Sequence, residues 1–77
     1  MATPTQLRMA RAALEWTLRE TADRAGVAFT TVNRIERGHA SPNRATMAAI
    51  QRALESAGIE FLDGDGVRVR PTAEASP

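Results

Sequence analysis

Three glycines divide most of this chain into short segments with helical character. Gly26, Gly38 and Gly58 each directly follow a stretch in which apolar residues recur every three or four positions, which is the spacing of one helix face. A glycine just past such a stretch is a common helix stop, because glycine adopts the left-handed conformation without steric cost. The pattern predicts three helices, at about 18–25, 28–37 and 44–57.

A further helix is predicted before these three. Pro4 is tolerated in its first turn, and either of the flanking threonines, Thr3 or Thr5, can cap it. The apolar stripe that follows is interrupted by the charged residue Arg11. Trp16 ends this region, and we expect it to anchor the core.

The helix starts differ in how well they are capped. Thr17 and Glu20 form a Thr-x-x-Glu capping box for helix 18–25, and Asn43 is a suitable cap for helix 44–57. Helix 28–37 begins instead with Ala28 and Phe29, where a hydroxyl or an acid is usual. The missing cap should cost about 0.5–2 kcal/mol of stability unless another group satisfies the exposed N–H groups.

Helix 28–37 has two chemically different sides. The expected inward side comprises Ala28, Val32 and Ile35. The opposite arc is polar and carries Thr30, Asn33, Arg34 and Arg37. Asn and Arg on a helix surface are usually solvated, but they are also the types that form bidentate hydrogen bonds with bases. From these residues alone, solvation and DNA contact both stay open.

After Gly58 the apolar period changes from helical to alternating. The segments IEFL and VRVR flank DGDG, a pattern typical of a β-hairpin at 59–70. An isolated two-stranded hairpin is marginal in water, so this one must pack on the helices or pair with another chain. If it pairs, the expected dimerisation residues are Ile59, Phe61, Val67 and Val69. We expect the polar, proline-bounded tail 71–77 to be disordered.

Composition restricts the classes of function. The 77 residues include no cysteine and one histidine, which excludes disulfides and thiolate metal sites and fits a reducing cytoplasm. We find no nucleophile–base set and no phosphate-binding glycine loop, so we expect neither an enzyme nor a cofactor. No signal peptide or apolar run near the ~20 residues of a membrane span is visible. Residues 1–58 hold eight arginines against five acids, whereas residues 59–77 hold two against four.

Several short motifs occur in one order along residues 6–58. They are an arginine-rich first helix, AxxAGV before helix 28–37, VxRIExG at its end, SP in the next loop, and T-h-x-x-h-x-x-A-L in helix 44–57, where h is apolar. In this set the chain resembles the phage-repressor-type helix-turn-helix family, the bacterial xenobiotic-response-element or Cro/C1 regulators. The resemblance implies an all-α bundle of four to five helices, which we assign to a DNA-binding domain at residues 1–58, followed by the short C-terminal β-hairpin at 59–70 and the tail at 71–77.

The resemblance also implies a DNA-binding site centred on helix 28–37 in the major groove. Base contacts are implied for Phe29, Thr30, Asn33 and Arg34. Phosphate contacts are implied for Thr17, Thr31, Arg37, His39, Asn43 and Arg44. A buried ion pair between Arg11 and Glu36 is implied as a structural element. Base contacts by asparagine or arginine are worth ~1–3 kcal/mol of discrimination each, whereas phosphate contacts add salt-sensitive affinity without sequence preference.

Three positions depart from the family pattern. Leu18 stands where glutamine is usual, Thr21 where leucine is usual, and Ala28 where a serine or threonine cap is usual. We interpret Leu18 as a packing residue and Thr21 as a core hydroxyl bonded to a backbone carbonyl. Phe29 packs against Glu36 or the first helix, or it contacts a thymine methyl or the sugar edge.

The leading hypothesis is a cytoplasmic, nucleoid-associated bacterial regulator of transcription. It would act as a homodimer and a repressor on a palindromic operator in double-stranded DNA, with half-sites ~10 bp apart. No membrane partner and no small-molecule ligand is evident from the sequence. The alternative is an antitoxin or protein-interaction module with weak DNA affinity, motivated by the departures at positions 18 and 28.

Overall fold

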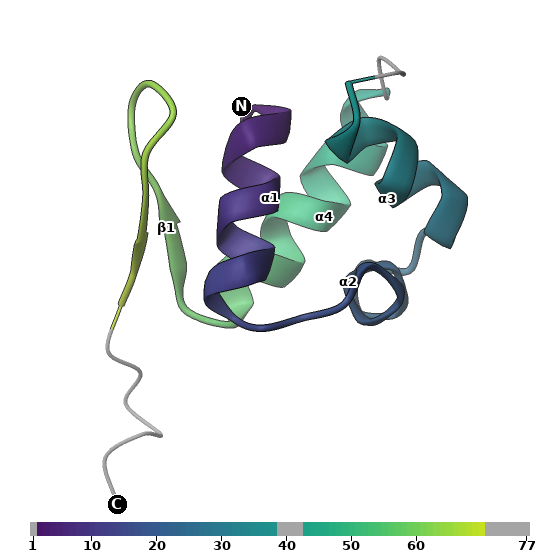
Figure 1. Ribbon diagram of the computed structural model, residues 1–77, viewed down its shortest axis with the longest axis horizontal. Coiled ribbons are helices and arrows are strands. Elements are labelled where there is room, and N and C mark those ends of the chain that lie inside the picture. The colour runs from purple at the N-terminus through teal and green to yellow at the C-terminus, as the bar shows by residue number, and fades with distance from the viewer. Residues whose placement is uncertain (1, 39–42, 71–77) are drawn as a thin grey trace, which may run out of the picture.

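Four helices followed by a two-stranded hairpin make up the part of the chain that the structure describes (Figure 1). The structure is a computed structural model that describes residues 2–38 and 43–70. The helices are α1 (Pro4–Ala13), α2 (Leu18–Ala25), α3 (Phe29–Glu36) and α4 (Arg44–Ser56), and the strands are β1 (Ile59–Phe61) and β2 (Val67–Val69). The predicted helical bundle with a C-terminal hairpin is confirmed. The predictions for His39 and for the tail 71–77 lie outside the described residues.

Two helices begin with the caps that the sequence offers. At α1, the Thr3 hydroxyl accepts from the Gln6 backbone N–H at 3.1 Å, and the Gln6 side chain accepts from the Thr3 N–H at 2.9 Å. Thr3, and not Thr5, is therefore the cap. At α4, the Asn43 side chain accepts from the Thr46 N–H at 2.7 Å. Each cap satisfies a donor that the helix itself leaves open.

Helix α2 has only half of its predicted capping box. The Thr17 hydroxyl accepts from the Glu20 N–H at 2.9 Å. The Glu20 carboxylate does not return to the Thr17 backbone but pairs with Arg24, one turn along the helix, at 3.1 Å. The Arg24 guanidinium also lies over the ring of Trp16, 4.5 Å from its centroid. This exposed pair therefore turns the carboxylate along α2, away from the helix start.

Helix α3 begins one residue later than predicted and lacks a side-chain cap. Ala28 has an extended backbone, with φ −72° and ψ 142°, and no side-chain hydrogen bond caps the helix. The prediction that Ala28 belongs to the inward cluster is wrong, since Ala28 is exposed. The reason is its position: a residue before the first helical turn does not follow the 100° rotation that places Val32 and Ile35 inward.

The core lies between the four helices and the inner face of the hairpin. Its buried apolar residues are Ala2, Leu7, Ala10, Trp16, Ala22, Val32, Ile35, Met47, Ile50, Leu54 and Ile59. Trp16 is buried as expected. Ala53 and Ala57, which lie at helical spacing from the buried Ile50 and Leu54, are only half-buried. Small side chains at the margin of α4 leave this side open beside α2.

The hairpin packs on its own helices, which was one of the two arrangements left open by the sequence. β1 and β2 are antiparallel, and the register pairs Ile59 with Val69 and Phe61 with Val67. Ile59 is fully buried, and Phe61 and Val67 pack against the core cluster. Figure 1 shows the hairpin alongside α1, on the side away from α2 and α3. The apolar side of the hairpin therefore faces the helices, and only Val69 among its four apolar strand residues is exposed, at 49 %.

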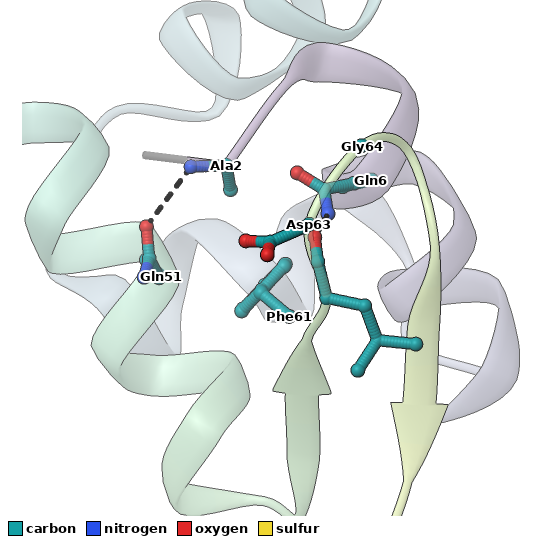
Figure 2. A pocket seen from close by; sticks show the side chains of 7 residues that line it. Ala2, Gln6, Gln51, Phe61, Asp63 and Gly64 are labelled. Atoms are coloured by element: carbon teal, nitrogen blue, oxygen red, sulfur yellow. Dashed lines mark hydrogen bonds between the residues drawn. The ribbon is translucent and has the colours of Figure 1, made fainter.

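Polar contacts hold the hairpin loop against the start of the chain. The buried Gln6 side chain donates to the backbone carbonyls of Leu62 and Gly66, each at 2.8 Å. The Ala2 N–H donates to Oε1 of Gln51 on α4 at 3.2 Å, beside a pocket that Gln6 and Asp63 also line (Figure 2). These bonds tie α1, α4 and the hairpin into one unit.

Candidate nucleic-acid interface

Helices α2 and α3 are joined by a tight turn. Gly26 adopts φ 71°, in the left-handed region that favours glycine, and ends α2. The Val27 N–H then bonds back to the Ala22 carbonyl at 3.0 Å. In Figure 1, α2 is seen nearly end-on while α3 runs across the view. Two short helices crossing over a glycine turn are a helix-turn-helix arrangement, in which the second helix is the one that enters the major groove.

The two sides of α3 meet different surroundings. Val32 and Ile35 are buried in the core. On the other side Thr30 and Arg34 are exposed, and Asn33 is half-buried. Within residues 2–38 and 43–70, the Arg34 guanidinium makes no hydrogen bond and no ion pair, so its five donors face solvent. The outward side of α3 thus presents donors of the type that read bases.

Most of the predicted phosphate-binding residues surround α3. Arg37 and Arg44 are exposed at the C-terminal end of α3 and at the first turn of α4. Thr17 and Asn43 are the caps of α2 and α4, whereas Thr31 is half-buried. A hydroxyl that accepts one hydrogen bond can still donate its own proton. Thr17 can therefore cap α2 and donate to a phosphate oxygen at the same time.

The C-terminal end of α3 is fixed to α1 by an ion pair. The Arg11 guanidinium binds the Glu36 carboxylate through two bonds, Nε to Oε2 at 2.7 Å and a terminal nitrogen to Oε1 at 2.9 Å. Its remaining terminal nitrogen donates to the Trp16 carbonyl at 3.0 Å. The side chains are 21 % and 7 % exposed, respectively. The implied Arg11–Glu36 pair is therefore present, with bidentate geometry.

The ion pair favours the charged form of Arg11. The pKa of Arg11 is raised mainly by its hydrogen bond with Glu36; burial opposes this effect, and the attraction of the carboxylate adds a smaller upward contribution. A raised arginine pKa contributes stability below the unfolded-state pKa, and this stability is lost only as the pH rises through the folded-state pKa. Since the pKa of an arginine already lies far above neutral and that of Arg11 is raised further, the Arg11 contribution is constant near neutral pH.

The residues that depart from the family pattern have structural roles. Leu18 packs against the core cluster. Thr21 is buried, and its hydroxyl donates to the Thr17 carbonyl at 2.9 Å, as interpreted from the sequence. Phe29 is half-buried against the core cluster, and the guanidinium of Arg19 lies 4.9 Å from its ring centroid. Arg19 belongs to α2, so this contact joins the starts of α2 and α3.

Sequence reasoning missed two arginines at this interface. Arg8 of α1 donates to the Glu36 backbone carbonyl at 2.7 Å, which satisfies an open acceptor at the end of α3. Arg19 stacks on Phe29 at the other end of α3. Neither contact follows from periodicity, because each joins residues on different helices. The only local signal was Arg19 itself, since a cation is unusual in the first turn of a helix.

Residues 2–38 and 43–70 contain no group of three or more His, Cys, Asp or Glu side chains that could hold a metal ion. In the same residues, no helix has the length and apolar character needed to cross a membrane.

A family model described as a helix-turn-helix matches residues 7–61, which covers most of the described chain. No curated protein matches the chain. The matched span includes all four helices and β1.

Proposed function

The chain belongs to the helix-turn-helix family of the Cro/C1 type, whose members are DNA-binding transcription regulators, and we propose that it represses transcription from a palindromic operator as a homodimer. In this proposal α3 enters the major groove, and repression follows from blocking access of the polymerase. The small size of the domain makes this steric mechanism the simplest one.

The outward side of α3 is the observation that carries the proposal. Arg34 is exposed and unpaired within the described residues, so it can fork onto O6 and N7 of guanine. Asn33 has the amide needed to pair with N6 and N7 of adenine. Thr30 is the third polar side chain on this arc. Its hydroxyl can form a hydrogen bond with a base edge or with the DNA backbone. We propose these three residues as the base-reading set.

The charged and capping residues around α3 supply the proposed backbone contacts. We assign phosphates to Arg37, Arg44, Thr17, Asn43 and Thr31. Each released counterion contributes to affinity, so binding should weaken as salt rises, with a slope set by the number of phosphates contacted. The phosphate contacts do not depend on the DNA sequence, and they position α3 in the groove.

We propose a homodimer because a single short helix reads few base pairs, and a two-fold pair reads two half-sites about 10 bp apart. The free edges of the two hairpin strands support the proposed homodimer. Each strand of the two-stranded sheet pairs on one side only, which leaves backbone groups that can add another strand. Val69, exposed on β2, is an apolar residue available to a partner. Ile59 is already in the core and is not proposed for this contact.

The dimer can be tested without disrupting the fold. Val69→Lys should give a monomer by light scattering and should leave the melting temperature nearly unchanged, because this side chain is half-exposed. A variant with the wild-type mass would show that this edge is not the interface. Deletion of the hairpin is a poorer test, since it removes Ile59 from the core.

The function itself can be tested by selecting genomic fragments that bind the protein and sequencing them. The proposal predicts a recurring palindrome with half-sites one helical turn apart. Recovery of fragments without a shared sequence would contradict it. Transcription from a promoter that carries the recovered site should then fall when the protein is present.

A protein-interaction module with weak DNA affinity is the second candidate. It is favoured by the uncapped start of α3 at Ala28 and by Leu18 packing on the core, where the family uses a polar residue. A salt titration separates the two candidates. Micromolar affinity that is the same for selected and random duplexes would favour the interaction module.

A further inference from the structure

A cation lies between the starts of the two helices of the helix-turn-helix. Arg19 is the second residue of α2, it is exposed, and its guanidinium lies 4.9 Å from the ring centroid of Phe29, the first residue of α3. A helix start carries partial positive charge, so cations are disfavoured there. Arg19 therefore occupies a position that is electrostatically unfavourable in the free protein with respect to both helices.

Arg19 forms no ion pair within the described residues. The ion pairs in residues 2–38 and 43–70 join Arg11 to Glu36, Arg24 to Glu20 and Arg68 to Glu60. Glu20, the acid in the first turn of α2, is thus turned away from Arg19. The guanidinium instead lies over the aromatic ring of Phe29, and this attraction is modest at an exposed site.

We propose that Arg19 binds a phosphate of the DNA backbone and that Phe29 positions its guanidinium for this contact. The inference rests on the proposed function, because it requires α3 to lie in the major groove. A phosphate offsets the cation and the two helix starts together. Arginine is suited to both contacts, because its flat guanidinium stacks on an aromatic ring and still donates in its own plane.

The assignment changes the role of Phe29. The ring packs against the core cluster and also lies under Arg19. Phe29 is therefore a positioning residue for Arg19, and it does not read a thymine methyl. This places the apolar first residue of α3 in the backbone-binding part of the interface and leaves Thr30, Asn33 and Arg34 to read sequence.

The test compares Arg19→Ala with Arg52→Ala on two probes, a random-sequence duplex and a duplex selected by the wild-type protein. Arg52 is the matched control, because it is also exposed but borders the groove between α2 and α4. Arg19→Ala should weaken binding to both probes by a similar factor, roughly tenfold. The slope of log affinity against log salt should fall by about 0.9, the value for one phosphate. Arg52→Ala should change neither quantity.

Phe29→Leu tests the positioning role while keeping an apolar side chain in the core. It should cause a smaller loss on both probes, and it should add no further loss when combined with Arg19→Ala. A changed sequence preference in Phe29→Leu would overturn the positioning role and restore direct base contact. Thermal melting checks the fold, and Arg19→Ala should shift the midpoint by less than about 4 °C.

The outcomes separate this inference from the proposed function. If the wild-type protein selects a sequence but Arg19→Ala binds both probes as the wild type does, the phosphate contact is wrong and the regulator stands. If the wild-type protein binds the selected and random duplexes equally, the proposed function is overturned. If it binds no duplex, both are overturned.

Discussion

The two ends of α3 are held in opposite ways. At its C-terminal end, Glu36 receives two bonds from Arg11 through its carboxylate and one from Arg8 through its carbonyl. At its N-terminal end, Ala28 provides no cap. Within the described residues, the N–H groups of Phe29 and Thr30 have no partner. One end is therefore fixed by the protein itself, and the other keeps its donors open.

This difference teaches how a short helix can be rigid and still receptive. Eight residues make a helix too short to be stable alone, so α3 depends on its buried side and on its link to α1. Because the C-terminal end fixes the orientation of α3, the missing cap at the N-terminal end disturbs that orientation little. The open N–H donors at the N-terminal end remain available to bind an anion. The position of the missing cap, at the end we assign to the DNA backbone, fits the proposed function.

The largest effect is expected when the fixed end of α3 is broken. Arg11→Met leaves Glu36 buried without a partner, which should lower the free energy of unfolding by ~3–5 kcal/mol. Urea denaturation measures this loss. The double variant Arg11→Met, Glu36→Leu removes both charges and should recover most of it. A single variant that loses less than ~1 kcal/mol would show that the pair does not anchor α3.

The next effect concerns the outward side of α3 between its two ends. Arg34→Ala should reduce discrimination at one position of the selected duplex by ~1–3 kcal/mol. Competition binding against duplexes substituted at each position measures this change. The melting temperature should hold, because Arg34 is exposed. A variant that unfolds would contradict the outward placement of this side chain.

A smaller effect should follow from closing the open end. Ala28→Ser adds a hydroxyl that can accept from an open N–H of α3, which should raise the free energy of unfolding by ~0.5–2 kcal/mol. Thermal melting measures the gain. Thr17→Ala, at the capped start of α2, is the matched comparison and should lose a similar amount. If Ala28→Ser melts at the same temperature as the wild type, another group already satisfies the N–H groups at the start of α3.

The smallest effect is expected from Arg8, the outer contact of the fixed end. Arg8→Ala removes one hydrogen bond to a backbone carbonyl that water can replace, so the free energy of unfolding should fall by about 1 kcal/mol or less. Chemical denaturation of Arg8→Ala and Arg11→Met under the same conditions ranks the contributions of the two arginines to stability. If Arg8→Ala were the more damaging variant, the carbonyl contact and not the ion pair would be the main anchor.

Local signals predicted the elements of this fold well. Threonine and asparagine caps, glycine stops and the change of period after Gly58 are properties of neighbouring residues, and the helices and strands follow them closely. The start of α3 was misplaced by one residue because Ala28 carries no cap signal. The ion pair of Arg11 with Glu36 came from the resemblance and not from periodicity.

The rest depended on contacts between distant residues. Whether the hairpin would pack on its helices was open because Val67 and Val69 suit either partner, and the choice is made by the Gln6 side chain and by the burial of Ile59. The stacking of Arg19 on Phe29 was missed for the same reason, since no spacing rule links two helices. The outward residues of α3 could be named from sequence because one helix contains them all.

The central claim is that the outward side of α3 reads a DNA sequence. The most direct test measures the affinity of the wild-type protein, at physiological salt, for its selected duplex and for a scrambled duplex of the same composition. The account predicts that the selected duplex binds at least ~10³-fold more tightly. Equal micromolar affinity for both duplexes, which depends on the salt concentration but not on the DNA sequence, would contradict it.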